Sequence, residues 1–537
     1  MDIGRDRLPV GLGVDFGIHI INRYREEAVK GYEPLEAMRE ANNQLMIAFV
    51  IVTVTTVFGF GANVISDLGP IRDLGIASAT GIIFTFLIFG LFLPAAKLEV
   101  DKLREAYGVP EFNSAPISSS DSTLGRLLTF PTQISQYAPI AFILVLVITG
   151  GMAAAYGSGV DTSFETEDFL PPEDLPEYVT GLPEPFAPSE YTVTETITLL
   201  EDRFSTNQDQ SVTIYVRGNF QEDHALEALA APNDDPPGAL AVGEGGSARP
   251  TSIVTVIQTQ AERDPEFARL VARSDVDGNG IPDRNLERIY DALFASPAGD
   301  RAAQYLTPDR RSAQVEYAID SGASQGEASA DAREFATQFR FAATATGQLV
   351  VFDAVTDIIF NSAIQGLILA MVLTGVFLVI SYGVLEGKPL LGIVNLFPIL
   401  IAIAFLLGTM RFLGLSLNAL TATILSISIG LGIAYSVHAT HRFVDEFNEN
   451  ADAYESMVIT FSGTGGALLG SMLTTSLGTG ALALAITPVL GDFGLLTAVS
   501  VLYSFVFTIV ALPPAVLLWE RYHGAWSSAD LPVDGQY

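Results

Sequence analysis

The sequence predicts an α-helical membrane protein that crosses the bilayer many times, is built from two repeats in the same orientation, and carries one extracellular α/β domain. Three observations lead to this fold class: long apolar stretches, a long polar stretch that divides them, and a motif that occurs twice. Of the 537 residues, 49% are hydrophobic and only 17% are charged. A soluble chain of this length normally carries about 25% charged residues.

Eight apolar stretches are long enough to cross a bilayer, which takes about 20 predominantly apolar residues. They lie at about 45–65, 74–96, 137–157, 359–382, 389–410, 416–440, 462–486 and 492–518. A ninth stretch, at about 8–22, is too short to span. The first nine residues are charged rather than apolar, so no cleavable signal peptide is predicted.

One motif occurs twice along the chain. GLGVDFGIHIINRYREE at 11–27 returns as GLGIAYSVHATHRFVDE at 430–446, an offset of 419 residues. The same offset pairs Asp73 with Asp492 and Leu93-Pro94 with Leu512-Pro513. Coincidences at one fixed offset indicate an internal repeat of membrane helices in the same orientation. Transporters use such repeats, with the coupling site between the halves near mid-membrane.

The repeat and the polar stretch together divide the chain into six segments. These are a partial first transmembrane repeat at 1–97, a cytoplasmic linker at 98–136, the first span of the second half at 137–157, an extracellular α/β domain at 158–356, a second transmembrane repeat at 357–520 and a cytoplasmic tail at 521–537. The short loops rich in Lys and Arg are assigned to the cytoplasm, and this assignment places 158–356 outside.

The polar stretch alternates strands with helices, as expected of an α/β domain. SVTIYVR at 211–217 and AQVEYAI at 313–319 are predicted strands, and 327–341 is a predicted helix. The stretch holds 35 acidic residues and 13 arginines, so it contributes −22 of the net charge of −33.

The charge of the whole chain is strongly acidic, and Lys occurs only at positions 30, 97, 102 and 388. An acidic, lysine-poor surface is typical of proteins adapted to molar salt, where charges are screened within about 3 Å, so we expect a haloarchaeal source. This balance argues against nucleic acid as a partner. The chain has no cysteine, which excludes disulfides and thiolate metal sites.

Asp15 is the leading candidate for chemistry in the membrane. A carboxylate at a helix centre in lipid costs roughly 2.5–3.5 kcal/mol, so such residues usually face an interior or a water path. We expect Asp15 to relay protons, and a structural hydrogen bond to a neighbouring helix is the alternative. His19 lies one turn away on the same face and is able to share the proton. The second copy has Ala434 at the aspartate position.

His438 and Tyr435 of the second copy complete the predicted relay. Because His438 occupies the position of His19 in a copy without an aspartate, packing is an alternative role for both histidines. Other polar residues on this span either line a proton path or make ordinary helix–helix hydrogen bonds. They are Asn418, Thr421, Ser426, Ser428 and Ser436. The Gly-rich stretches 58–70 and 463–484 are interpreted as close helix packing.

The segment DVDGNGIPD at 275–283 is a candidate calcium loop in the polar domain. Oxygen-bearing side chains alternate before a glycine, as in known calcium loops. The proposed ligands are Asp275, Asp277, Asn279 and Asp283. The acid expected at position twelve is replaced by Leu286, and Glu287 follows one position late. An ordinary acidic turn therefore remains the alternative to a Ca²⁺ site.

The motif at 11–27 resembles the fourth-helix motif of the resistance-nodulation-division (RND) superfamily, in its MMPL-like branch, which is related to sterol-sensing-domain proteins. The segments DFLPPEDLPEY and TGQLVVFDAVTDIIFNSAI are also similar to this branch. The resemblance implies a helix bundle of twelve spans, six in each half, with a porter domain after the first helix of each half. It also implies transport driven by protons, with Asp15 as the proton-carrying aspartate. Phe16 stands where many members have tyrosine, and Ala434 stands where many have a second aspartate.

On this basis the protein is expected to be a secondary exporter of lipids or other hydrophobic molecules in the cell membrane, and not an enzyme. The alternatives are a protein-export auxiliary of the SecDF type and a non-transporting protein of the sterol-sensing type. The chain has no GK[ST] phosphate-binding loop, so ATP hydrolysis has no support. Membrane lipids and a hydrophobic small molecule are the expected partners, with a homo-oligomer as a further option. Coupling to sodium instead of protons stays open.

The start of the chain departs from the repeat. The offset maps MDIGRDRLPV onto LTATILSISI at 420–429, which is apolar and mid-membrane. No span tolerates the charges of 2–7 at that depth. The repeat therefore predicts that roughly 280–300 residues of a first half are lost or separately encoded.

Overall fold

The computed structural model describes residues 7–108, 123–162, 170–171, 211–243, 245–320 and 322–527. Most of the DFLPPEDLPEY segment and the charged residues 2–6 lie outside these ranges. The chain divides into two compact units. The first comprises Met1–Pro188 with Ile358–Tyr537, and the second comprises Ser189–Asp357.

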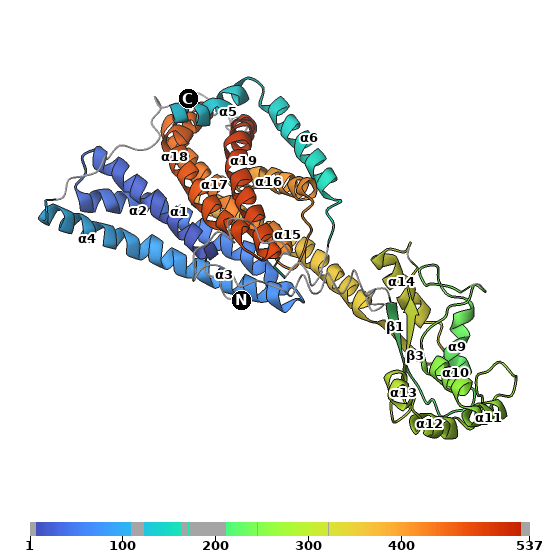
Figure 1. Ribbon diagram of the computed structural model, residues 1–537. Helices are drawn as coiled ribbons and strands as arrows, with labels where there is room; N and C mark the ends of the chain where they lie inside the picture. Colours follow the sequence, from blue (N-terminus) through green and yellow to red (C-terminus); the bar gives the residue numbers. More distant parts are fainter. Residues whose placement is uncertain are drawn as a thin grey trace, which may run out of the picture. The chain divides into compact units, whose positions relative to one another are not determined.

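Eight helical segments of the described chain are long and apolar enough to cross a membrane, as the sequence predicts. They are Pro34–Ile65, Gly69–Ala106, Pro139–Gly157, Gln348–Glu386, Leu390–Leu413, Thr421–Asn450, Ala453–Leu484 and Pro488–Tyr522. In the labels of Figure 1 they contain α2 (Pro34–Gly61), α3 (Gly69–Thr85), α4 (Leu93–Ala106), α6 (Pro139–Gly157), α15 (Gln348–Glu386), α16 (Leu390–Leu413), α17 (Thr421–Asn450), α18 (Ala453–Gly480) and α19 (Pro488–Ser527). The helices extend beyond the apolar cores because polar residues at their ends continue the helical turns.

Two more helices belong to the membrane unit. The short apolar stretch near the start of the chain forms α1 (Arg7–Val29). The segment treated as a cytoplasmic linker contains α5 (Thr123–Tyr137), which packs against α18 and α19. Leu128 on α5 is buried against Gly465, whereas Leu127 and Phe130 are exposed. The sequence analysis missed α5 because its apolar residues are too few for a span.

The internal repeat is visible in the helix boundaries. The offset of 419 residues maps α2 (Pro34–Gly61) onto α18 (Ala453–Gly480), and the following 3₁₀ turn η1 (Ala62–Ile65) onto η5 (Ala481–Leu484). It also maps the start of α3 onto the start of α19. The chain therefore contains two copies of one helical arrangement in the same order.

Helix α17 forms the centre of the bundle, and its apolar window is completely buried. It crosses α2 where two glycines meet: a Cβ atom added to Gly59 would lie 2.7 Å from Gly430 Cα. The Thr56 hydroxyl donates to the Gly430 carbonyl over 2.9 Å, and Asn63 Nδ2 donates to Ser426 Oγ over 2.8 Å. Small residues let two membrane helices approach closely, so the Gly-rich stretch 58–70 serves packing, as interpreted from the sequence.

Asn418, Ser428 and Ser436, at the start of α17 and along it, also have hydrogen-bond partners in the protein. Ser428 accepts from Ser500 Oγ at 2.6 Å, and Ser436 Oγ donates to the Asn395 carbonyl at 3.1 Å. Asn418 Oδ1 accepts from the first backbone N–H groups of the helix. Ser428 and Ser436 therefore make the helix–helix hydrogen bonds that were predicted as one of their two roles, and Asn418 caps the helix. The other role, in a proton path, stays a prediction.

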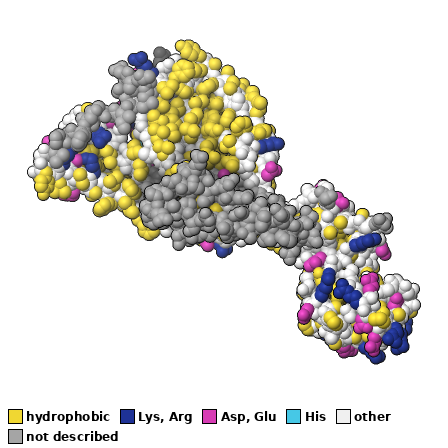
Figure 2. All heavy atoms as spheres, viewed as in Figure 1, with side chains coloured by type: hydrophobic (Ala, Val, Ile, Leu, Met, Phe, Trp, Pro, Cys, Tyr) yellow, Lys and Arg dark blue, Asp and Glu magenta, His cyan; other side chains and the backbone are white. Residues whose placement is uncertain are grey.

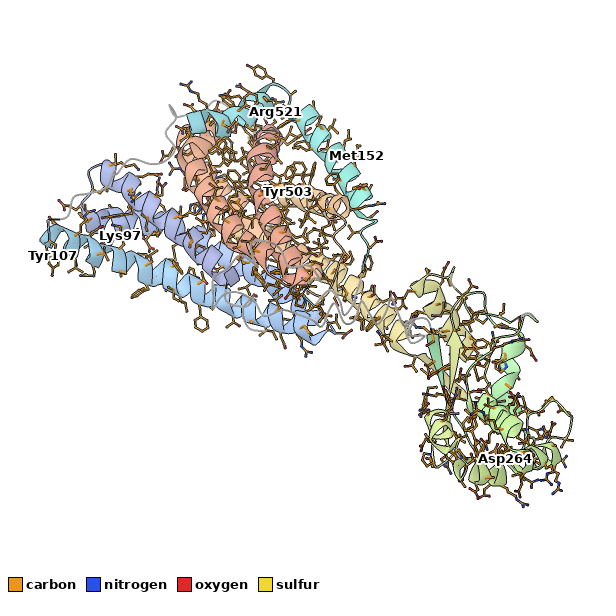
Figure 3. The ribbon with its side chains drawn as sticks, in the orientation of Figure 1. Lys97, Tyr107, Met152, Asp264, Tyr503 and Arg521 are labelled. Atoms are coloured by element: carbon orange, nitrogen blue, oxygen red, sulfur yellow. The ribbon has the colours of Figure 1, made fainter. Side chains whose placement is uncertain are left out.

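The outer face of the membrane unit is apolar (Figure 2). Met152 on α6, labelled in Figure 3, is 67% exposed, and Phe92 in the π-helical turn η2 (Phe86–Phe92) is equally so. Side chains of this kind favour contact with lipid tails over water.

The second unit contains a three-stranded antiparallel sheet of order β2-β1-β3, with β1 (Ser211–Arg217), β2 (Ser312–Ala318) and β3 (Ala342–Thr346). The two predicted strands are confirmed, and β3 is an addition. Alternate residues of β1 (Val212, Ile214 and Val216) enter the core, as the period of two requires.

The described part of this unit also contains six helices of six to twelve residues, of which α10, α13 and α14 contact the strands (Figure 1). They are α9 (Ala225–Ala230), α10 (Ile253–Arg263), α11 (Pro265–Ser274), α12 (Leu286–Phe294), α13 (Gly299–Tyr305) and α14 (Gln325–Ala336). Their apolar faces share one core with the sheet, which includes Ile257, Tyr290 and Phe335. The helix predicted at 327–341 ends earlier, as α14, because residues 342–346 pair with β1 as β3.

Candidate functional site

Asp15 on α1 is buried inside the membrane unit, with 4% of its surface exposed. One helical turn further, His19 is buried to the same extent. His19 Nε2 lies 3.3 Å from Asp15 Oδ1, at an angle that does not make a regular hydrogen bond. The predicted neighbourhood of the two side chains on one helix face is therefore confirmed.

His438 on α17 joins this pair from the second repeat. The His19 and His438 rings are stacked, with centroids 4.2 Å apart and planes 17° apart. The edge of Phe49 on α2 closes the other side of His438, with ring centroids 5.8 Å apart. Asp15, His19 and His438 each offer a polar atom, and these three atoms lie within 4.8 Å of one another. The cluster can hold a proton or a cation between the two repeats.

Tyr435 lies one turn before His438, also buried, and its side chain is close to Asp15. Ser471 on α18 lies next to both Asp15 and Tyr435, and Thr475 lies next to Tyr435. The sequence analysis missed Ser471 and Thr475. They belong to a stretch of small residues interpreted as packing, and no spacing rule marks a single serine or threonine as part of a site.

A small cavity leads away from the two stacked histidines. Its volume is about 50 Å³, and its lining runs from His19 and His438 to Arg23, Gln44 and Arg442 on α1, α2 and α17. A buried water needs about 10–15 Å³, so a few waters fit. Among the described residues, His438 Nε2 has no hydrogen-bond partner.

Carboxylates neutralise the two arginines beside the cavity. Arg23 Nη2 lies 3.3 Å from Glu27 Oε1 and also pairs with Glu26. Arg442 Nη2 lies 2.6 Å from Glu446 Oε1. The repeat thus places an equivalent Arg–Glu pair, four residues apart, on α1 and on α17. Arginines at such positions are able to anchor a helix at a membrane boundary.

The candidate calcium loop closes on itself in the second unit. Asp275 Oδ1 accepts from Gly278 N at 2.7 Å, and its Oδ2 accepts from Gly280 N at 2.8 Å. Gly278 and Gly280 have φ values of 81° and 84°, a region that glycine adopts without strain. Asp275, Asp277 and Asp283 bring one carboxylate oxygen each within 4.8 Å of one another. The geometry fits an oxygen-liganded cation, and Ca²⁺ binding itself stays a prediction.

Two residues from outside the loop join it, and the sequence analysis missed both. His224 Nδ1 lies 2.8 Å from Glu227 Oε2 and 3.0 Å from Asp283 Oδ1. Asn279 Nδ2 donates to Glu227 Oε1 over 3.3 Å. The hydrogen bond to Glu227 raises the pKa of His224 above its usual value. The backbone N–H of Val276 holds the pKa of Asp283 below its usual value.

The assembled arrangement is two helical repeats with a buried carboxylate and two histidines at their contact. Residues 7–98 and 243–530 match the family model described as the MMPL family. The chain belongs to the MMPL family. The match includes Asp15, His19, Tyr435 and His438, so the motif that carries the resemblance lies within it.

Among curated proteins, a membrane protein of Methanocaldococcus jannaschii is 33% identical over 135 residues, covering 25% of this chain and 35% of that protein. Among solved structures, SecDF of Thermus thermophilus, titled a translocon-associated membrane protein, aligns with a TM-score of 0.51 and 14% identity. The alignment covers 96% of this chain and 54% of SecDF. A SecDF structure in the super-membrane-facing form aligns with a TM-score of 0.50 and 15% identity. This alignment covers 98% of this chain and 56% of the SecDF chain.

These matches show an RND-type membrane fold for an MMPL protein. The chain spans about a third of the curated relative and about half of the SecDF chains that it matches. Both the MMPL family and the SecDF neighbours are consistent with a protein that is not an enzyme.

Proposed function

We propose that this MMPL protein is a secondary transporter that exports lipids or other hydrophobic molecules, and that protons passing through the Asp15–His19–His438 cluster drive the export. The observation that carries the proposal is the position of the cluster. A carboxylate buried in the membrane unit touches a histidine of its own repeat, and that histidine stacks on the equivalent histidine of the other repeat.

The cluster supplies two kinds of proton acceptor. Asp15 is charged when deprotonated and neutral when protonated, and a buried charge favours a different arrangement of polar neighbours from a neutral group. His438 takes the place of the second acidic group, since Ala434 stands at the aspartate position of the second repeat. Ser471 and Tyr435, next to Asp15, supply hydroxyls for either state.

The cavity below the histidines supports a route for protons toward one side of the membrane. Its far end lies beside Arg23 and Arg442, and the distribution of Lys and Arg assigns that end to the cytoplasm. Entry of one proton down a potential of 100 mV supplies about 2.3 kcal/mol. Protonation at Asp15 biases how the two repeats pack, and this change in packing moves the substrate.

The remaining parts of the proposal concern surroundings and partners. We place the protein in the cell membrane with the acidic second unit outside, in contact with membrane lipids and a hydrophobic substrate. A second copy of the chain is a further partner in this proposal.

A test uses chromosomal variants, so that the protein acts with whatever else the cell provides. Asp15→Asn keeps the shape of the side chain but cannot exchange a proton. We expect the lipid profile of this strain to match that of a deletion strain, with a membrane-derived or hydrophobic compound accumulating. Asp67→Asn, at an exposed aspartate, is the matched control. A wild-type profile in the Asp15→Asn strain would contradict the proposal.

A protein-export auxiliary is the second candidate, and one observation favours it. The fold aligns with SecDF over 96% of this chain. An unchanged lipid profile in the deletion strain, together with defective protein secretion and co-purification of translocon subunits, would support this candidate instead.

A further inference from the structure

A second cavity lies within the second unit, away from the membrane cluster. Its volume is about 590 Å³, which is in the range of small-molecule sites. Helix α10 forms one wall, and the starts of α11 and α13 form the others. Asp264, labelled in Figure 3, lies at the rim, where α10 ends and α11 begins.

The α10 wall is a polar stripe. Thr255, Thr259 and Arg263 are spaced by four residues, and Thr251 precedes them at the same spacing. Residues four apart lie on one face of a helix, and all four line the cavity. The Thr259 hydroxyl donates to the Thr255 carbonyl at 2.7 Å, which leaves its oxygen able to accept from a ligand. Thr255 belongs to the cap of α10, where its hydroxyl donates to the Ser252 carbonyl at 2.7 Å and accepts from Ser252 N at 2.8 Å.

Gln260 contributes an amide to the lining of the cavity. The residue as a whole is 7% exposed, and its amide atoms are accessible from the cavity and have no hydrogen-bond partner within the described part of the chain. The Gln260 amide offers two N–H donors and one acceptor to a molecule in the cavity.

Two arginines give the cavity its charge. Arg263 from α10 and Arg301 from α13 both line it, and neither forms an ion pair within the described residues. Among the described lining residues Asp264 is the one acid, and its carboxylate accepts from Glu266 N and Phe267 N at the start of α11. Two free guanidinium groups facing one cavity stand out in a region of net charge −22.

The rest of the lining is apolar. Pro250, Val256, Pro265, Pro297 and Ala298 contribute to it. An oxyanion matches two guanidinium groups, since arginine forms paired hydrogen bonds with carboxylate or phosphate. An apolar group next to that oxyanion matches the prolines and the valine. The lining therefore suits a molecule with both parts.

We propose that this cavity binds an anionic amphiphile, with a carboxylate or phosphate head on Arg263, Arg301 and Gln260 and its apolar part against the prolines. The proposal concerns binding alone and does not depend on export or on proton coupling. A phospholipid head group and a free fatty acid share this chemistry, and the two are separated by testing each.

The experiment measures hydrogen–deuterium exchange of the full chain in nanodiscs, because peptides covering 250–265 and 297–301 report on the cavity directly. The probes are dihexanoyl phosphatidylglycerol, octanoate, dihexanoyl phosphatidylcholine and inorganic phosphate. We expect one or both of the first two probes to slow exchange in these peptides. Phosphatidylcholine and inorganic phosphate should do so only at about tenfold higher concentration or more. The choline cation of phosphatidylcholine cancels the charge of its phosphate, and inorganic phosphate lacks the apolar part.

Variants of the lining residues test whether the protection depends on their side chains. Arg263→Gln together with Arg301→Gln should weaken the protection by about tenfold or more. Gln260→Leu should also weaken the protection, and the leucine side chain should keep the helix packed. Arg273→Gln, an exposed arginine on α11 outside the cavity, should leave it unchanged.

Four results would overturn the proposal, and the first three concern the amphiphiles and the arginine variant. They are no protection by either anionic amphiphile, equal protection by the zwitterionic lipid, and an Arg263→Gln/Arg301→Gln variant that responds like the wild type. Protection by inorganic phosphate at the same concentration as the amphiphiles would also overturn it, since the apolar wall would then contribute nothing.

Discussion

The imidazole rings of His19 and His438 lie face to face with their centroids 4.2 Å apart, although the two residues are 419 positions apart in the chain. They occupy the same position in the two repeats. The repeats therefore touch at their equivalent points, and Asp15 lies at this contact from one side only.

The first prediction concerns this pair of histidines. His438→Phe keeps a ring that stacks on His19 and meets Phe49, but it cannot accept a proton. We expect the bundle to stay folded and proton uptake by membrane vesicles of the variant strain to fall by about tenfold or more. Thermal unfolding of the purified variant checks the fold. Unchanged proton uptake would assign His438 to packing alone.

The second prediction concerns the crossing of α2 and α17. Gly59→Ala would place a Cβ atom 2.7 Å from Gly430 Cα, so one helix must shift. We expect a destabilisation of about 1–3 kcal/mol, measured by unfolding in detergent. Gly61→Ala on the same helix is the matched control, because nothing lies within 4 Å of its added Cβ. An equal change in stability at both positions would show that the change comes from helix propensity and not from the close contact of α2 with α17.

The third prediction concerns pH and the contact between His224 and the loop at 275–283. Because the pKa of His224 is raised, protonated His224 stabilises its contact with the loop fully below about pH 6.5. This stabilisation is lost as the pH rises through the raised pKa. Because the pKa of Asp283 is lowered, the ionised carboxylate stabilises the same contact fully above about pH 4. This stabilisation is lost as the pH falls through the lowered pKa.

The contact should accordingly be strongest between these limits. Hydrogen exchange of α9, corrected for the intrinsic effect of pH, should be slowest there. The His224→Gln variant should lose the alkaline part of the response and keep the acidic part. Protection that increases from neutral to alkaline pH would contradict the assignment.

The fourth prediction concerns calcium. If the loop holds Ca²⁺ through Asp275, Asp277, Asn279 and Asp283, about millimolar Ca²⁺ should raise the unfolding temperature of the second unit, and Mg²⁺ should do so less. Asp277→Asn should reduce the shift. A melting curve that millimolar Ca²⁺ does not move would indicate an acidic turn held by its own hydrogen bonds.

The fifth prediction concerns the side of the membrane on which the second unit lies. The chain has no cysteine, so a single introduced cysteine is the only thiol in it. Arg273→Cys should react in intact cells with a membrane-impermeant maleimide, whereas Lys102→Cys should react only after the membrane is opened. The reverse pattern would invert the topology.

Much of the fold can be predicted from the sequence, because spans and repeats are properties of neighbouring residues. Hydropathy located all eight spans, and the fixed offset anticipated that α2 and α18 begin and end at matching residues. The alternation in β1 and β2 and the one-turn spacing of Asp15 and His19 are local in the same sense. The family motif identified Asp15 before any contact was known.

Only the tertiary structure decided which of these local features meet. The stack of His19 on His438, the approach of Ser471 to Asp15, and the addition of His224 and Glu227 to the 275–283 loop join residues far apart in the chain. Hydropathy and spacing predict which face of a segment is buried. They do not predict which other segment it packs against. That choice depends on side-chain shape and close approach, as where Gly59 meets Gly430, and such fit exists only once the helices have packed.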